Sequence, residues 1–172
     1  TPLNAIVGFS DLLMTVDDPA EQEEFRRTIQ KNNTLLLQLF SDIIDLSKID
    51  AGSFEYTPKP VCLYQFCAMM VQKMRNKVSE GVELQIDEDS PLDAWFSADS
   101  GYLNQVVTNF MSNAIKFTHR GTITVGYRID ARQQFEMFVE DTGIGISIEN
   151  QEAVFDRFMK VDSFVQGTGL GL

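Results

Sequence analysis

Two asparagines and a lysine in one segment have the residue types and the spacing to bind a magnesium-bound polyphosphate. Asn109 and Asn113 are four residues apart, and Lys116 follows about one turn later, so on a helix the three side chains share nearly one face. Amide oxygens are hard ligands that suit Mg²⁺, and a lysine neutralises phosphate charge. A solvated polar helix face has the same spacing, so this segment does not decide the question by itself.

An acidic residue leads into a glycine-rich turn later in the chain. Residues 139–146 read Val-Glu-Asp-Thr-Gly-Ile-Gly-Ile, a strand end followed by glycines that let a ligand approach the backbone closely. An ionised Asp141 is only a hydrogen-bond acceptor. It therefore suits the amino group of adenine and opposes the carbonyl oxygen of guanine. An Asp-Thr-Gly surface turn is the alternative interpretation.

A third segment places glycines at alternate positions. Residues 167–172 read Gly-Thr-Gly-Leu-Gly-Leu. The successive backbone N–H groups of such a run can cradle phosphates, above all where a helix begins next. A flexible tail is the alternative for this segment taken alone.

The elements that position these residues begin with two amphipathic helices, predicted over residues 3–15 and 19–50. Asp18 suits the N-cap of the second helix, and Gly52 is placed to end it. The apolar seam of that helix alternates steps of four and three residues. It consists of Phe25, Ile29, Asn32, Leu36, Leu39, Ile43 and Leu46.

The apolar stripe is too wide for one hairpin to bury. Residues 3–50 are therefore predicted to form a homodimer, in which two hairpins make a four-helix bundle. Asn32 in the seam has two interpretations. It specifies the register of the bundle, as polar seam residues do in coiled coils, or it is a simple solvated interruption.

The remainder of the chain mixes helix and strand patterns and is predicted to be α+β, with helices on one face of a mostly antiparallel sheet. Asp99 suits the N-cap of a helix that reaches Phe117, and another helix is expected over residues 61–78. The predicted strands are residues 53–57, 82–86, 93–97, 121–129 and 135–140.

The charge balance disfavours polyanionic partners. Lys and Arg number 14 and Asp and Glu number 25 among 172 residues, a net charge of −11. Nucleic-acid binding requires a basic stripe that this sequence lacks, and an anionic membrane surface is disfavoured for the same reason. No apolar run approaches the roughly 20 residues that span a bilayer.

The two cysteines and the two ends of the chain lead to further expectations. Cys62 and Cys67 are five residues apart, which is poor disulfide geometry on a helix. We expect buried free thiols in a reducing compartment. The chain opens on Thr1 and Pro2 and closes on the glycine run, so we expect an excerpt of a longer protein.

In their order and spacing, five segments together resemble the bacterial sensor histidine kinases of two-component systems. Residues 109–117 resemble the N box of that family, residues 141–145 the first glycine box, residues 155–158 the F box and residues 167–171 the second glycine box. Residues 1–6 resemble the tail of the phosphoacceptor box. The resemblance covers essentially the whole chain.

The resemblance implies two domains and a phosphoryl-transfer reaction. Residues 1–52 would be the dimerisation and histidine-phosphotransfer hairpin, and residues 53–172 a C-terminally incomplete α/β-sandwich ATP-binding domain of the Bergerat type. The family uses ATP and Mg²⁺ to phosphorylate a histidine, and a receiver-domain aspartate of a response regulator then takes the phosphoryl group. That histidine lies four residues before the threonine matched by Thr1. The resemblance therefore implies that residues 1–172 alone do not autophosphorylate.

The matched motifs also imply roles for individual residues. Asn113 would hold Mg²⁺ with Asn109 beside it at the catalytic centre, and Lys116 would meet phosphate. Phe117, where many relatives have tyrosine, would pack near the adenine, whose amino group Asp141 would bind. The glycine boxes imply further nucleotide-binding residues, namely Gly143, Gly145, Gly167, Thr168, Gly169 and Leu170. Residues 148–166 would form a short mobile lid.

Thr1 matches a position at which relatives orient water to dephosphorylate the regulator, which implies a phosphatase role. His119 cannot replace the acceptor, because it follows the N box.

Two alternatives stay open: a non-catalytic dimeric scaffold with a vestigial pocket, and a gyrase-like ATPase. ATPases of that class carry a glutamate base where this chain has Asn109, and an amide is no useful base near neutral pH. We expect these residues to lie in the cytoplasm and to make no contact with a membrane. Whether the longer parent protein is anchored in the bacterial plasma membrane is left open.

Overall fold

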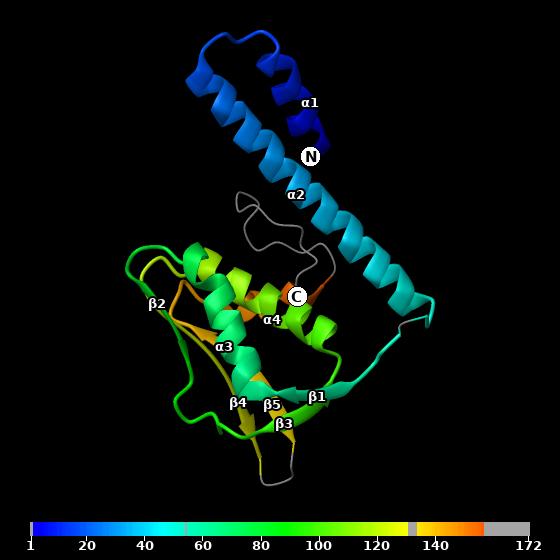
Figure 1. The fold of residues 1–172 in the computed structure, drawn as a ribbon, viewed down its shortest axis with the longest axis vertical. Coiled ribbons are helices and arrows are strands. Elements are labelled where there is room, and N and C mark those ends of the chain that lie inside the picture. The colour runs from blue at the N-terminus through cyan, green and yellow to red at the C-terminus, as the bar shows by residue number, and fades with distance from the viewer. Residues whose placement is uncertain (1, 54, 131–133, 157–172) are drawn as a thin grey trace. The chain divides into compact units, whose positions relative to one another are not determined.

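The computed structural model describes residues 2–53, 55–130 and 134–156. The chain divides into two compact units, the first of which includes the residues up to Glu55, while the second begins at Tyr56. Figure 1 shows a helical first unit and a mixed α/β second unit. No helix in these described ranges is long and apolar enough to cross a bilayer.

The first unit is an antiparallel helical hairpin, as predicted. It consists of α1 (Pro2–Leu13) and α2 (Pro19–Asp50), which run side by side in opposite directions (Figure 1). Asp18 caps α2, because its side chain accepts a hydrogen bond from the backbone N–H of Ala20 at 2.9 Å. The rings of Phe9 and Phe25 lie 5.4 Å apart between the helices.

Asn32 is the one buried residue of α2. Its side-chain amide donates to the backbone carbonyl of Thr28 at 2.8 Å, one turn earlier in the same helix. A solvated interruption is therefore the wrong interpretation of this polar seam residue. Its role in the register of a bundle stays a prediction.

The second unit packs α3 (Leu63–Met74) and α4 (Ser100–Phe117) against a three-stranded sheet (Figure 1). The strand order is β2 (Val82–Ile86), β4 (Gly121–Ile129) and β5 (Phe135–Asp141), with β2 parallel and β5 antiparallel to β4. A separate antiparallel pair joins β1 (Lys59–Cys62) to β3 (Trp95–Ala98). The predicted α+β class and the mixed, mostly antiparallel pairing are confirmed.

The core of the second unit lies between the two helices and the sheet. Leu63, Met70 and Met74 of α3 and Met111 of α4 are almost completely inaccessible to solvent, as is Val125 of β4. The buried residues of α3 recur at the three- and four-residue spacing of a helix face, as do those of α4, so each helix presents one side to the sheet.

Two element predictions are wrong in their bounds. Residues 55–57 are not a strand; the N–H of Thr57 instead donates to an Asp99 oxygen at 3.1 Å. The strand β1 comes later and contains Pro60, which is tolerated because β1 has a neighbour on one side only. Because residues 59–62 are extended, α3 begins later than predicted, and its end tightens into a 3₁₀ turn at Arg75–Lys77.

Both cysteines are free thiols, as expected. Cys67 is fully buried, and this burial raises the pKa of its thiol to about 12. Cys62 is only partly buried, so the expectation of a buried thiol is right for Cys67 alone. Cys62 is the last residue of strand β1, whereas Cys67 lies on the buried face of α3.

Candidate functional site

The last turns of α4 bring the two asparagines and the lysine onto one side of the helix. Val107, Met111 and Ala114 are the buried residues of α4 and mark its core-facing side. At 100° per residue, Asn109, Asn113 and Lys116 fall on the opposite side. All three side chains are partly buried. The predicted clustering of these polar groups on one helix face is therefore what the fold produces.

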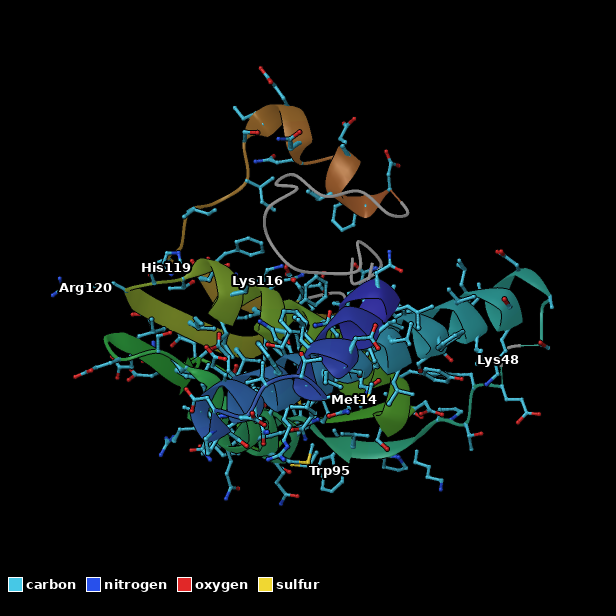
Figure 2. The ribbon with its side chains drawn as sticks, turned by 90° about the horizontal axis from the view of Figure 1, so that it is seen from above. Met14, Lys48, Trp95, Lys116, His119 and Arg120 are labelled. Atoms are coloured by element: carbon cyan, nitrogen blue, oxygen red, sulfur yellow. The ribbon has the colours of Figure 1, made fainter. Side chains whose placement is uncertain are left out.

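Lys116 lies close to an aromatic ring at the end of α4. Its ammonium nitrogen is 4.9 Å from the centroid of the Phe117 ring, within the range of a cation–π contact. Figure 2 shows Lys116 on the helix, with His119 and the outward-pointing Arg120 in the connection to β4. His119 is exposed.

Asp141 is the last residue of β5 and lies beside the end of α4. Its backbone pairs with Ile123 of β4. One carboxylate oxygen, Oδ1, accepts hydrogen bonds from the backbone N–H of Gly143 at 2.9 Å and from the hydroxyl of Thr118 at 3.3 Å. The side chain is exposed, so a carboxylate with one anchored oxygen faces outward at this strand end.

Gly143 lies so close to the end of α4 that no residue with a Cβ atom fits at its position. A Cβ atom at this position would lie 2.4 Å from the carbonyl oxygen of Phe117 and 2.8 Å from Asp141 Oδ1. The N–H of Ile144 donates to the same Phe117 carbonyl at 3.3 Å. The glycine turn is thus attached to the end of α4, which brings Phe117 and Asp141 together.

A threonine side chain fastens the other side of this turn. The hydroxyl of Thr142 accepts from the N–H of Thr122 at 2.9 Å. A Cβ atom on Gly121 would lie only 2.1 Å from this Thr142 oxygen, so the hydroxyl occupies the space that a side chain on residue 121 would need. Gly121 has a φ of 124°, which also favours glycine. The base of the turn is therefore held by both β4 and α4.

The structure brings together part of the predicted site. Phe117, Asp141 and Gly143 meet at one end of α4, and Asn109, Asn113 and Lys116 extend along that helix. Gly145 follows in the turn with a φ of 67°. Of the predicted lid, residues 148–156 form two short 3₁₀ turns, Ile148–Asn150 and Ala153–Phe155. Other predicted positions lie outside the described residues: Thr1, Gly167, Thr168, Gly169, Leu170 and the rest of the lid.

Sequence reasoning missed three residues that hold the site, namely Thr118, Gly121 and Thr142. Thr118 directly follows the asparagine-containing helix, and Thr142 lies inside the glycine turn. Neither position carries a local signal of its partner, because each hydrogen bond spans at least 20 residues of sequence.

Two family models match the chain one after the other. The His Kinase A (phospho-acceptor) domain matches residues 1–52. The histidine kinase-, DNA gyrase B-, and HSP90-like ATPase matches residues 98–172, which include α4 and the glycine turn.

Known sensor kinases are similar over the whole chain. The aerobic respiration control sensor protein ArcB of Escherichia coli (strain K12) is 34% identical over 178 residues; the match covers 100% of this chain and 23% of ArcB. The chain therefore spans about a quarter of that relative's length.

Among solved structures, full-length ShkA in complex with AMPPNP is 27% identical with a TM-score of 0.69, covering 99% of this chain and 36% of ShkA. ThkA in complex with the response regulator protein TrrA shares the fold at 23% identity and a TM-score of 0.66, covering 93% of this chain and 47% of that one. The chain belongs to the sensor histidine kinases, and it carries sequence of that family's phosphoacceptor and ATPase domains.

Proposed function

We propose that these residues act as the core of an ATP-dependent protein-histidine kinase in a two-component system. The observation that carries the proposal is the junction of the glycine turn with α4. There the outward-facing carboxylate of Asp141 lies beside Gly143, whose backbone is so close to the Phe117 carbonyl at the end of α4 that only glycine fits. This junction lies at the end of the helix that carries Asn109, Asn113 and Lys116.

The residues at this junction suit an adenine nucleotide. Asp141 accepts a hydrogen bond from the adenine amino group, and Phe117 packs near the base. Gly143 and Gly145 form the pocket wall, where a side chain on Gly143 would collide with α4. The second glycine box supplies backbone N–H groups to the phosphates, through Gly167, Thr168, Gly169 and Leu170.

The polar face of α4 suits the metal-bound phosphates. Asn113 offers an amide oxygen to Mg²⁺, with Asn109 beside it at the catalytic centre, and Lys116 neutralises phosphate charge. Bound ATP supplies the γ-phosphoryl group that the reaction transfers. An amide at residue 109 does not activate water as a glutamate would, which favours a kinase over a hydrolytic ATPase.

The phosphoryl acceptor in this proposal is a histidine four residues upstream of Thr1, from which a response-regulator receiver aspartate takes the group. The phosphoacceptor-domain match over residues 1–52 and the ThkA–TrrA complex support this partner. Thr1, four residues after that histidine in sequence, orients water for dephosphorylation of the regulator. Because the reaction uses ATP and a receiver domain, we place these residues in the cytoplasm.

The hairpin is the homodimer interface of this proposal, through residues 3–50. Large apolar side chains of the second half of α2 are exposed in the single chain, with Leu37 at 70%, Phe40 at 57% and Ile44 at 53%. A second hairpin would cover such a stripe in a four-helix bundle.

Labelling with γ-phosphate-labelled ATP tests the proposed reaction. A protein that extends upstream through the expected histidine and downstream of Leu172 should acquire label that is stable in alkali and labile in acid. The label should move to an aspartate when a cognate receiver domain is added. A folded protein that binds ATP and acquires no label would contradict kinase activity and favour a non-catalytic scaffold.

A further inference from the structure

Thr118 is a buried hydroxyl-bearing residue directly behind the carboxylate of Asp141. It lies at the C-cap of α4, where its N–H donates to the carbonyl of Ala114, and its exposed fraction is 1%. Its hydroxyl oxygen is 3.3 Å from Asp141 Oδ1. An ionised carboxylate only accepts hydrogen bonds, so the hydroxyl proton of Thr118 points at that oxygen.

Both hydrogen bonds to the Asp141 side chain end on the same oxygen. The Gly143 N–H donates to Oδ1 at 2.9 Å, and Thr118 is the second donor. In the described part of the chain no hydrogen bond reaches Oδ2. Because both donors contact Oδ1 and the side chain as a whole is exposed, one carboxylate oxygen is held inward and the other, Oδ2, is left to face outward.

The two donors differ in what they anchor the carboxylate to. Gly143 is two residues from Asp141 and belongs to the same turn, so its N–H moves with that turn. Thr118 is 23 residues away in sequence and belongs to the end of α4. Thr118 therefore ties the carboxylate directly to the end of the helix that carries Asn109 and Asn113, whereas Gly143 ties it to that helix only through the turn.

We propose that Thr118 is a positioning residue for base specificity, which holds Asp141 so that Oδ2 alone presents an acceptor to the purine 6-position. This proposal rests on the adenine-nucleotide site proposed above. Because Thr118 is buried, it acts through Asp141 and does not contact the base. An amino group at the purine 6-position donates to Oδ2, whereas a carbonyl oxygen there opposes it.

Titration of the protein with ADP and IDP tests this role. The two nucleotides share their ribose and phosphates, and they differ in the 6-amino group of adenine and the 6-oxo group of hypoxanthine. Thr118→Val keeps the β-branched shape and removes the donor. We expect its ratio of IDP Kd to ADP Kd to fall about tenfold below the wild-type ratio, about 1.4 kcal/mol. Thr118→Ser keeps a hydroxyl and should retain most of the ratio.

Thr108→Val is the matched control for this substitution. Thr108 lies on α4, and its buried hydroxyl has no hydrogen-bond partner among the residues that the structure describes. The same change of atoms at this position should leave the ADP-to-IDP preference unchanged. Thermal unfolding of each variant shows that the compared proteins are folded, and Thr118→Ala gives the same readout if Thr118→Val does not fold.

The outcomes separate this inference from the proposed function. If removal of the Thr118 hydroxyl weakens ADP and IDP equally, or changes neither, Thr118 is only structural and the inference is wrong, while the nucleotide site stands. If the folded wild-type protein binds neither nucleotide, both the proposed function and this inference are wrong. A selective loss of ADP affinity supports both.

Discussion

At the scale of single residues, the two oxygens of Asp141 have different surroundings. Oδ1 accepts hydrogen bonds from Thr118 and Gly143, while the carboxylate as a whole is exposed. A substitution that keeps an oxygen at the Oδ1 position therefore changes only the group that faces a ligand. Asparagine does this, because its oxygen can accept both bonds and its NH₂ group then occupies the outward position.

We expect Asp141→Asn to weaken ATP binding by about 1.5–3 kcal/mol, because a charge-assisted hydrogen bond is lost. Its outward NH₂ group would oppose the adenine amino group and suit the guanine carbonyl, so the preference for ATP over GTP should fall. Calorimetric titration with both nucleotides measures this. Glu140→Gln is the control, since it removes the same charge from the exposed neighbouring residue and should leave the preference intact. Equal binding of ATP and GTP by the wild-type protein would show that Asp141 does not read the base.

A substitution of Asn113 tests the proposed metal site in the same way. Replacing Asn113 by Ala removes an oxygen ligand and keeps a strong helix former in α4. We expect autophosphorylation at limiting Mg²⁺ to fall by about 100-fold, which corresponds to about 2.7 kcal/mol of barrier.

Asn104→Ala provides the comparison for that variant. It removes an amide from the same helix, but its side-chain oxygen accepts from Lys73 of α3 at 3.2 Å. This variant should keep wild-type dependence on Mg²⁺. An unchanged rate in Asn113→Ala at limiting metal would remove Asn113 from the site.

At the scale of elements, Asp99 joins the segment before β1 to the start of α4. One oxygen accepts from the backbone N–H groups of Gly101 and Tyr102, and the other accepts from the N–H of Thr57. The Thr57 bond, the N–H groups of α4 and the charge of Lys59 hold the pKa of Asp99 below its ordinary value.

This lowered pKa predicts a loss of stability in acid. A carboxyl with a folded-state pKa below its unfolded value stabilises the fold at pH above the unfolded value, about 3.9. The contribution is lost as pH falls through the folded pKa. We expect the melting temperature of Asp99→Asn, which keeps a capping side chain, to fall less steeply than wild type below about pH 4. Identical slopes for the two proteins would contradict the role of the ionised carboxylate.

The seam of α2 predicts an oligomeric state. In a four-helix bundle the Leu39 side chain lies in the seam, so Leu39→Glu would bury an unpaired charge at severe cost. Sedimentation should give a dimer for the wild-type protein and a monomer for this variant. Gln38→Glu places the same charge at an exposed α2 position that is on neither the seam face nor the face of Leu37 and Phe40, and it should leave the dimer intact. A wild-type monomer at micromolar concentration, in a protein with the full first helix, would contradict the bundle.

At the scale of the whole molecule, phosphoryl transfer requires an imidazole aligned with the γ-phosphorus, because positioning supplies most of the catalysis. His119 is the one histidine among residues 1–172, and it is exposed in the connection after α4. We therefore expect these 172 residues by themselves to incorporate no phosphohistidine from labelled ATP. Mass spectrometry after labelling checks this, and label on His119 that disappears in His119→Asn would overturn the expectation.

Much of the fold follows from short-range patterns. The hairpin, the Asp18 and Asp99 caps and the strands around β4 and β5 were predictable, because a helix face or a cap depends on residues within about four positions of one another. The predicted strand at residues 53–57 failed because alternation alone does not supply a partner. The backbone there meets Asp99, 42 residues away from Thr57 in sequence.

The proposed site likewise has features that follow from the sequence and features that depend on the tertiary structure. Residue types and spacing alone determined the resemblance to sensor histidine kinases, and they alone predicted an acceptor role for Asp141 and a metal-binding role for the amides of Asn109 and Asn113. Only the tertiary structure decided that Thr118 lies behind Asp141 and which carboxylate oxygen faces outward. These contacts depend on how β5 pairs with β4 and where α4 ends against the turn. A sequence pattern encodes the properties of each segment, whereas the distance between two segments is decided when they pack around a shared core.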